Sequence, residues 1–272
     1  MFEILQHNFF QNAIIAAILV SIACGIIGSF VMINRLFSMA GGITHGAFGG
    51  IGIALYFGLS VLLSTGIFTL ILAFLVAFLT RHYQNRSDSI IAVIWAFGMA
   101  FGLILIDLSP GYNTDLMAYL FGNILTVSNE DLYLMAFVDM IFILIILAFF
   151  RQFEVLSFDI EFAKLRGVNT TLFYYILIAM IAFCIVISIR VVGLILVIAL
   201  LSIPCFIAEH FTKRLGSLII LSVFLSMIFC VLGLIFSVSF NLSSGPSIIG
   251  IACCGFFLCL CMKFFKNLFS NA

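Results

Sequence analysis

The chain has 272 residues, of which 65% are hydrophobic and 8% are charged, and its formal net charge is zero. A soluble domain has about 25% charged residues, so the composition excludes an ordinary soluble protein and indicates an integral membrane protein whose surroundings are lipid. The balanced charge, with no basic face and no acidic tail, argues against a nucleic-acid partner.

Apolar runs long enough to cross a bilayer follow one another along the chain. A membrane-spanning helix needs about 20 apolar residues, and each crossing is helical because a lone strand in lipid would leave its backbone amides unpaired. The runs are 9–33, 36–57, 62–80, 89–107, 132–150, 171–189, 191–209, 216–240 and 247–262. We therefore predict an all-α, polytopic helical bundle with about eight or nine transmembrane helices, forming one domain over residues 1–272.

The lysines and arginines predict the orientation of the bundle. If the loop that carries Arg81 and Arg86 faces the cytoplasm, every other basic residue except Arg190 faces it too, as the positive-inside rule expects. The N-terminus is then outside and the C-terminus is cytoplasmic. Asp107 and Asp115 fall on the outer side, where they attract cations, pair with a docking protein or are simply solvated.

The stretch MAGGITHGAFGG, residues 39–50, places a histidine among five glycines. Counted from Arg35, His45 lies about ten residues into its apolar run, which corresponds to a depth of roughly 15 Å. An ionisable side chain at that depth is costly unless it is paired or hydrated, and by default it indicates a functional site. His45 is either a metal ligand on a transport path or a structural hydrogen-bonding group.

The glycines around His45 divide into two sets by their spacing. One set lies four residues apart, which favours the close approach of another helix: Gly42, Gly46 and Gly50. The other set lies one helical turn on either side of the histidine, so we expect a groove with little side-chain bulk beside the imidazole: Gly41 and Gly49. Such a groove holds an ion or a file of water molecules. The adjacent glycines at 41 and 42 also weaken the helix, as in transporters whose broken helices line a binding site.

The most charged segment is RQFEVLSFDIEFAKLRGVNTT, residues 151–171. Phe158, Phe162 and Leu165 recur with helical spacing, and the segment also supplies an N-cap, a charge pair and a C-terminal glycine: Asp159, Glu161 with Lys164, and Gly167. We predict a short amphipathic helix on the cytoplasmic side. This helix either lies in the membrane interface or inserts its apolar side chains into a groove of a soluble partner.

Other polar residues in the apolar runs are weaker candidates for a functional role. Glu209 and His210 are candidate ligands where a metal leaves the path, although adjacent helix positions point about 100° apart. Asp139 lies in the middle of a run, and we expect it to form a structural hydrogen bond or to serve a helix contact. Asp88 is expected to cap the helix that begins there.

Five segments, in this order, resemble the signature segments of bacterial ABC permeases that import zinc, manganese or iron: SMAGGITHGAFGG, LMAYLFGNILTVS, SFDIEFAKLRGV, VVGLILVIALLSIP and SSGPSIIG. The resemblance implies a type II permease, related to the vitamin B12 importer, in the bacterial cytoplasmic (inner) membrane. It implies a homodimer with a cytoplasmic ABC ATPase dimer and an extracytoplasmic metal-binding protein. It also implies that the segment at about 151–170, including Glu161 and Gly167, is the coupling helix, and that His45 lines the metal path.

One position departs from the family pattern. The family usually has an aspartate one helical turn before the histidine, where both side chains reach one ion, and this chain has Gly41 there. Manganese and iron(II) favour oxygen ligands, whereas zinc accepts imidazole readily. The sequence therefore favours zinc over manganese or iron as the transported cation, and it indicates no tightly bound cofactor. The missing carboxylate is equally consistent with faster transit without a tight site, or with a ligand supplied from elsewhere.

We expect this chain to be the permease subunit of an ATP-driven importer of a divalent transition metal, and not itself an enzyme. The chain has no GxxxxGK[ST] loop, so ATP hydrolysis must come from a separate subunit. The alternative is an ion-coupled secondary metal carrier or channel, which usually has paired charges at mid-membrane, where His45 and Asp139 are nearly alone. A membrane enzyme is disfavoured because motifs such as HExxH and GxSxG do not occur.

Overall fold

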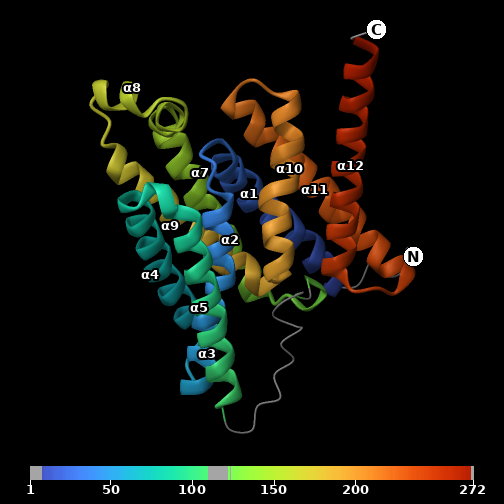
Figure 1. Cartoon of the computed structure of the whole chain (residues 1–272). Helices are drawn as coiled ribbons and strands as arrows, with labels where there is room; N and C mark the ends of the chain where they lie inside the picture. Colours follow the sequence, from blue (N-terminus) through green and yellow to red (C-terminus); the bar gives the residue numbers. More distant parts are fainter. Residues whose placement is uncertain (1–7, 110–121, 123, 271–272) are drawn as a thin grey trace. The chain divides into compact units, whose positions relative to one another are not determined.

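The computed structural model describes residues 8–109, 122 and 124–270, and these residues form helices without a strand. The α-helices are α1 (Asn8–Ile33), α2 (Phe37–Gly46), α3 (Phe48–Phe57), α4 (Val61–His82), α5 (Ser87–Asp107), α7 (Asn129–Phe158), α8 (Ile160–Leu165), α9 (Thr170–Val192), α10 (Leu194–Phe211), α11 (Leu215–Phe240) and α12 (Ser244–Ser270) (Figure 1). Two short 3₁₀ turns, η2 (Gln84–Arg86) and η3 (Ile124–Thr126), complete the set. The predicted all-helical class is confirmed.

Within the described ranges, 8 helices are long and apolar enough to cross a membrane: α1, α4, α5, α7, α9, α10, α11 and α12. The remaining predicted run, 36–57, is occupied by α2 and α3, which have 10 residues each. A ten-residue helix is about 15 Å long, so neither crosses a bilayer alone. The two helices meet at Ala47, where the chain leaves regular helix for one residue.

The chain divides into two compact units. Unit 1 comprises Met1–Ser29, Phe121–Asp139 and Val191–Ala272, and unit 2 comprises Phe30–Leu120 and Met140–Arg190. In unit 1, α10, α11 and α12 pack against one another, and the buried side chains of Ile207, Phe229, Ala252 and Cys259 form a hydrophobic cluster. In unit 2, the broken pair α2 and α3 packs against α4 and α5 (Figure 1). Unit 2 therefore positions His45.

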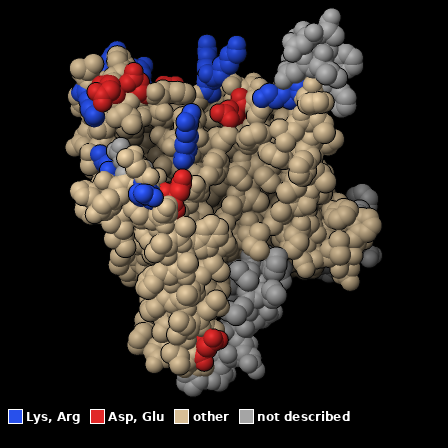
Figure 2. Space-filling model, in the orientation of Figure 1, with Lys and Arg blue, Asp and Glu red and all other residues tan. Residues whose placement is uncertain are grey.

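The ends of several helices in unit 2 come together where α8 lies. Near this end the side-chain amide of Asn34 donates to Ser157 Oγ (2.9 Å), and Arg81 donates to Thr171 Oγ1 (3.4 Å). Figure 2 shows most of the blue and red side chains gathered toward one end of the view, with a wide uncharged surface below them that ends in a red patch. A charged rim beside a wide apolar band is what a helical bundle in a bilayer requires.

Candidate transport site

His45 lies in the last turn of α2, just before the interruption at Ala47. Its imidazole is stacked on the indole of Trp95 from α5, with ring centroids 4.2 Å apart and planes 9° from parallel. The ring nitrogen Nδ1 is buried and has no hydrogen-bond partner among the described residues. A buried polar atom without a partner is costly and calls for an explanation, and a cation in transit is a partner that the imidazole would accept.

A structural role for His45 requires a nearby hydrogen-bond partner, and Thr44 is the residue next to it in the chain. The Thr44 hydroxyl instead donates to the Ala40 carbonyl at 2.7 Å, one turn back along its own helix. The Thr44 hydroxyl therefore donates its hydrogen bond within α2 and not to His45. Nδ1 of His45 is therefore both buried and without a hydrogen-bond partner among the described residues.

Trp95 is the residue at this site that the sequence did not single out. It is the only tryptophan of the chain, it is 40% exposed, and its Nε1 donates to the Met99 sulfur at 3.2 Å. Tryptophans of membrane proteins are enriched at the two interfaces, whereas Trp95 lies well inside α5. That unusual position was the one available signal.

The glycines spaced four apart face the neighbouring helices α4 and α5. A β-carbon added at Gly42 would lie 2.7 Å from Ile91 Cγ2, and one added at Gly50 would lie 2.6 Å from the α-carbon of Thr65. One added at Gly98 of α5 would lie 2.6 Å from the α-carbon of Gly46. The predicted close approach of helices along Gly42, Gly46 and Gly50 is confirmed.

The expected groove on both sides of His45 is found on one side only. A β-carbon at Gly41 would meet nothing within 4 Å, so this position opens to free space. At Gly49 it would lie 2.6 Å from the Phe68 ring and 3.3 Å from the Gly98 carbonyl, so Gly49 is packed. Phe68 of α4 and the main chain of α5 therefore occupy the Gly49 side of the expected groove.

The other candidate ligands are not gathered around His45. Asp107 is the exposed last residue of α5, and Glu209 is exposed on α10. His210 Nδ1 shares a hydrogen bond with the Phe206 carbonyl at 2.8 Å, one turn back along α10. Asp115 lies outside the described residues. In the described ranges no group of three or more His, Cys, Asp or Glu side chains is placed to hold a metal.

The structure bears on the two remaining predictions for acidic side chains, those for Asp88 and Asp139. The Asp88 cap is wrong, because α5 begins one residue earlier at Ser87, its N-cap is Arg86, and no side chain caps it. Asp139 is buried in α7, but its Oδ2 has no hydrogen-bond partner among the described residues, in contrast to the bond expected of it. It belongs to unit 1.

The helix α8 forms as its sequence predicts. Asp159 accepts a hydrogen bond from the Phe162 amide at 2.9 Å, and Lys164 pairs with Glu161 at 3.0 Å. Gly167 has φ +75°, with its amide bonded to the Lys164 carbonyl and the Val168 amide to the Ala163 carbonyl. These two bonds form a Schellman motif, which ends a helix with a left-handed glycine.

The side chains of α8 sort by burial into two faces. Ala163 is fully buried, whereas Phe162 and Leu165 are 42% and 86% exposed. The third residue of the predicted apolar stripe, Phe158, is 63% exposed but ends α7, and the extended residue Asp159 separates it from α8. Exposed apolar side chains on a capped helix form a surface that another molecule covers more favourably than water does.

Comparisons with known sequences agree over nearly the whole chain. The model of a family described as the ABC 3 transport family matches residues 6–263. An uncharacterized membrane protein of Synechocystis sp. is 44% identical over 263 residues, which cover 97% of this chain and 94% of that protein. The manganese transport system membrane protein MntC of Listeria monocytogenes is 30% identical over 255 residues, covering 94% of this chain and 91% of that one.

Solved structures show the same fold. The structure of PsaBC from Streptococcus pneumoniae in complex with Fab has a chain that matches with a TM-score of 0.84 and 31% identity, covering 93% of this chain and 91% of that chain. A metal-chelate type ABC transporter in an inward-facing conformation matches with a TM-score of 0.71 at 22% identity, over 96% of this chain and 86% of the other.

Proposed function

Because the chain belongs to the ABC 3 transport family, we propose that it is the permease subunit of an ATP-binding cassette importer that moves a divalent transition metal into the cytoplasm. The observation that carries the proposal is the buried, unpartnered Nδ1 of His45 beside the interruption of α2 and α3. An imidazole nitrogen is a ligand for divalent transition metals, and broken helices line binding sites in transporters.

Two observations bear on which metal is carried. The names of the relatives support manganese, since MntC of Listeria monocytogenes and ScaB of Streptococcus gordonii are both named for manganese import. The donor set supports zinc, because Gly41 removes the carboxylate that would suit manganese and leaves an imidazole. Both metals are therefore tested as substrates. Because Gly41 replaces a carboxylate, we expect this chain to accept zinc more readily than its relatives do.

The proposal includes partners. Energy comes from a cytoplasmic ABC ATPase dimer that receives the outward stripe of α8, and an extracytoplasmic protein delivers the metal to a homodimer of this chain. The basic residues at the α8 end of unit 2 support a cytoplasmic position for that end, with the N-terminus outside and the C-terminus inside. An ion-coupled carrier or channel is the alternative and would work without the ATPase.

The test is transport in vesicles that contain the chain, its ATPase and its metal-binding protein. We expect uptake of radioactive zinc or manganese that requires ATP and stops when the phosphate-binding lysine of the ATPase is substituted. Uptake that persists with the inactive ATPase would favour the carrier or channel. If neither metal nor iron is taken up by the active complex, the assignment of the cargo is wrong.

A further inference from the structure

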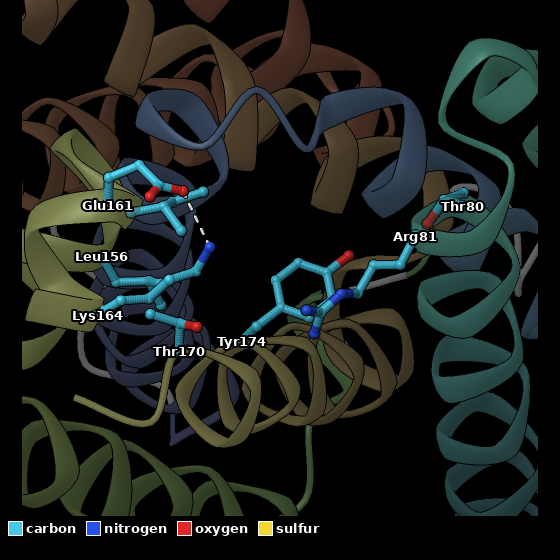
Figure 3. A pocket seen from close by; sticks show the side chains of 8 residues that line it. Thr80, Arg81, Leu156, Glu161, Lys164, Thr170 and Tyr174 are labelled. Carbon is cyan, nitrogen blue, oxygen red and sulfur yellow. Dashed lines mark hydrogen bonds and ion pairs between the residues drawn. The ribbon is translucent and has the colours of Figure 1, made fainter. Parts of the chain in front are cut away.

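A polar pocket of about 450 Å³ lies at the charged end of unit 2. Three helix ends and α8 supply its walls, and its polar lining is Thr80, Arg81, Glu161, Lys164, Thr170 and Tyr174. Figure 3 shows the ammonium group of Lys164 and the hydroxyl of Tyr174 directed into the same space, with the Arg81 side chain reaching toward Tyr174 from the opposite side. The volume falls in the range of about 300–1,000 Å³ typical of small-ligand sites.

The charge of this pocket favours an anion. Lys164 is paired with Glu161 at 3.0 Å, but no carboxylate of the described residues lies within 4 Å of the Arg81 guanidinium. That guanidinium lies 5.2 Å from the Tyr174 ring centroid and hydrogen-bonds Thr171. An arginine that contacts an aromatic ring and one hydroxyl still has most of its N–H groups free to donate to another acceptor. The planar guanidinium group can donate two parallel hydrogen bonds to phosphate oxygens.

The ends of the helices around the pocket also contribute partial charges to it. The 23-residue helix α9 begins at Thr170 in the pocket wall, and the N-terminus of a helix carries a positive partial charge that favours anions. The C-terminus of α4 carries the opposite partial charge at the same pocket, and Arg81 and His82 in its last turn offset it. The last turn of α7, which contributes Leu156, also brings a negative helix end to the pocket, so the positive charge comes from the side chains: Arg81 and Lys164 against Glu161.

We propose that this pocket binds a phosphate-type oxyanion, which bridges Arg81 of α4 and Lys164 of α8. Such a ligand would tie the helix that carries the outward stripe to the helix that packs on the glycines near His45. The inference concerns a site other than the metal path, and it holds whichever metal the chain carries.

Lipid headgroups and soluble phosphate both present this chemistry, and the lining favours the lipid. Leu156 and Ile160 add apolar surface beside the cations, which suits the glycerol and ester region behind a headgroup phosphate. The pocket is lined by the last turn of the apolar helix α4 and by the first turns of the apolar helix α9, so it lies where these helices end. Basic pockets at this level of membrane proteins bind anionic headgroups.

The experiment measures lipid retention by the purified full-length chain in detergent, using native mass spectrometry with phosphatidylglycerol and with zwitterionic phosphatidylcholine. We expect wild-type protein to retain phosphatidylglycerol preferentially, and Arg81→Gln to weaken that retention about tenfold, as loss of a charge-assisted hydrogen bond does. Arg86→Gln is the matched control, since it removes the same charge from the adjacent turn, outside this pocket. It should retain the lipid as wild type does.

A second arm uses inorganic phosphate, followed by phosphorus NMR line broadening in the same detergent. Binding of phosphate that is sensitive to Arg81→Gln, without retention of phosphatidylglycerol, would identify a soluble anion as the ligand. If Arg81→Gln does not fold, Lys164→Gln replaces it, because that exposed side chain does not contribute to the core. Wild-type levels of lipid and phosphate binding in both pocket variants, or the same loss in Arg86→Gln, would overturn the proposal.

Discussion

The indole of Trp95 covers one face of the His45 imidazole, with the two ring centroids 4.2 Å apart. The two residues are 50 positions apart in the chain and are brought together by the packing of α2 on α5. An aromatic ring against one face of an imidazole restricts the plane of that imidazole, whose ring nitrogens bind metals at its edge. If the proposed metal path passes His45, we expect Trp95 to act as a positioning residue for it.

The first prediction uses Trp95 as a built-in reporter. Because the chain has a single tryptophan, tryptophan emission of the purified permease comes from the ring stacked on His45. We expect manganese(II) and cobalt(II), which are paramagnetic, to quench this emission in wild type and to leave His45→Ala unchanged. A quench of equal size in both proteins would show that the metal binds elsewhere.

The second prediction concerns transport itself. His45→Ala removes the unpartnered imidazole and should lower ATP-dependent metal uptake at least about tenfold, the scale seen when a residue that tunes a metal site is lost. Basal ATP hydrolysis and assembly with the ATPase should stay near wild type, because His45 is remote in sequence from α8. Trp95→Phe keeps an aromatic ring on the imidazole and should retain most of the uptake. Undiminished uptake by His45→Ala would remove this residue from the path.

The third prediction restores a carboxylate. A side chain at Gly41 would meet nothing within 4 Å, so Gly41→Asp is accommodated one turn from His45. An oxygen ligand suits manganese better than zinc, and we expect the ratio of manganese to zinc uptake to rise. Gly41→Asn, which has the same shape without the charge, is the control and should change the ratio less. An unchanged ratio in Gly41→Asp would mean that the cation does not pass this face of α2.

The fourth prediction separates packed from open glycines. Gly98→Ala places a methyl group 2.6 Å from the α-carbon of Gly46, and overpacking of this kind costs roughly 1–3 kcal/mol. Gly41→Ala meets no atom and should instead stabilise its helix by about 0.5–1 kcal/mol, the usual gain from replacing a helical glycine. Thermal unfolding in detergent, followed by tryptophan emission, would show opposite shifts of the midpoint. Shifts in the same direction would contradict the packing described for α2 and α5.

The fifth prediction tests α8 as the docking element for the ATPase. Phe162→Asp puts a charge into the outward apolar stripe and should reduce co-purification of the ATPase about tenfold or more, as expected of an aromatic anchor. Asn85→Asp adds the same charge at an exposed position of the neighbouring turn η2, and it should not affect assembly. Intact assembly in Phe162→Asp would leave the membrane interface as the place of this helix.

Features set by neighbouring residues could be predicted from the sequence. The cap at Asp159, the Glu161 pair and the left-handed Gly167 each depend on contacts within a few positions, so the pattern in the chain contains them. The membrane runs were equally readable, because the length and polarity of a bilayer core constrain every crossing.

Features set by tertiary packing could not be predicted in the same way. Nothing in the order of residues links Trp95 to His45, because their contact depends on how α2 docks on α5. The packed state of Gly49 was also missed, since its closeness to Phe68 and to the Gly98 carbonyl depends on how α4 and α5 pack against α3.

The contact between Gly46 and Gly98 joins main chain to main chain. No flexible side-chain layer separates α2 from α5 at this point, and rotamer changes cannot absorb a displacement there. The backbone of α2 that carries His45 is therefore held rigidly against α5. If the proposed transport involves a movement of α2, we therefore expect α5 to move with it.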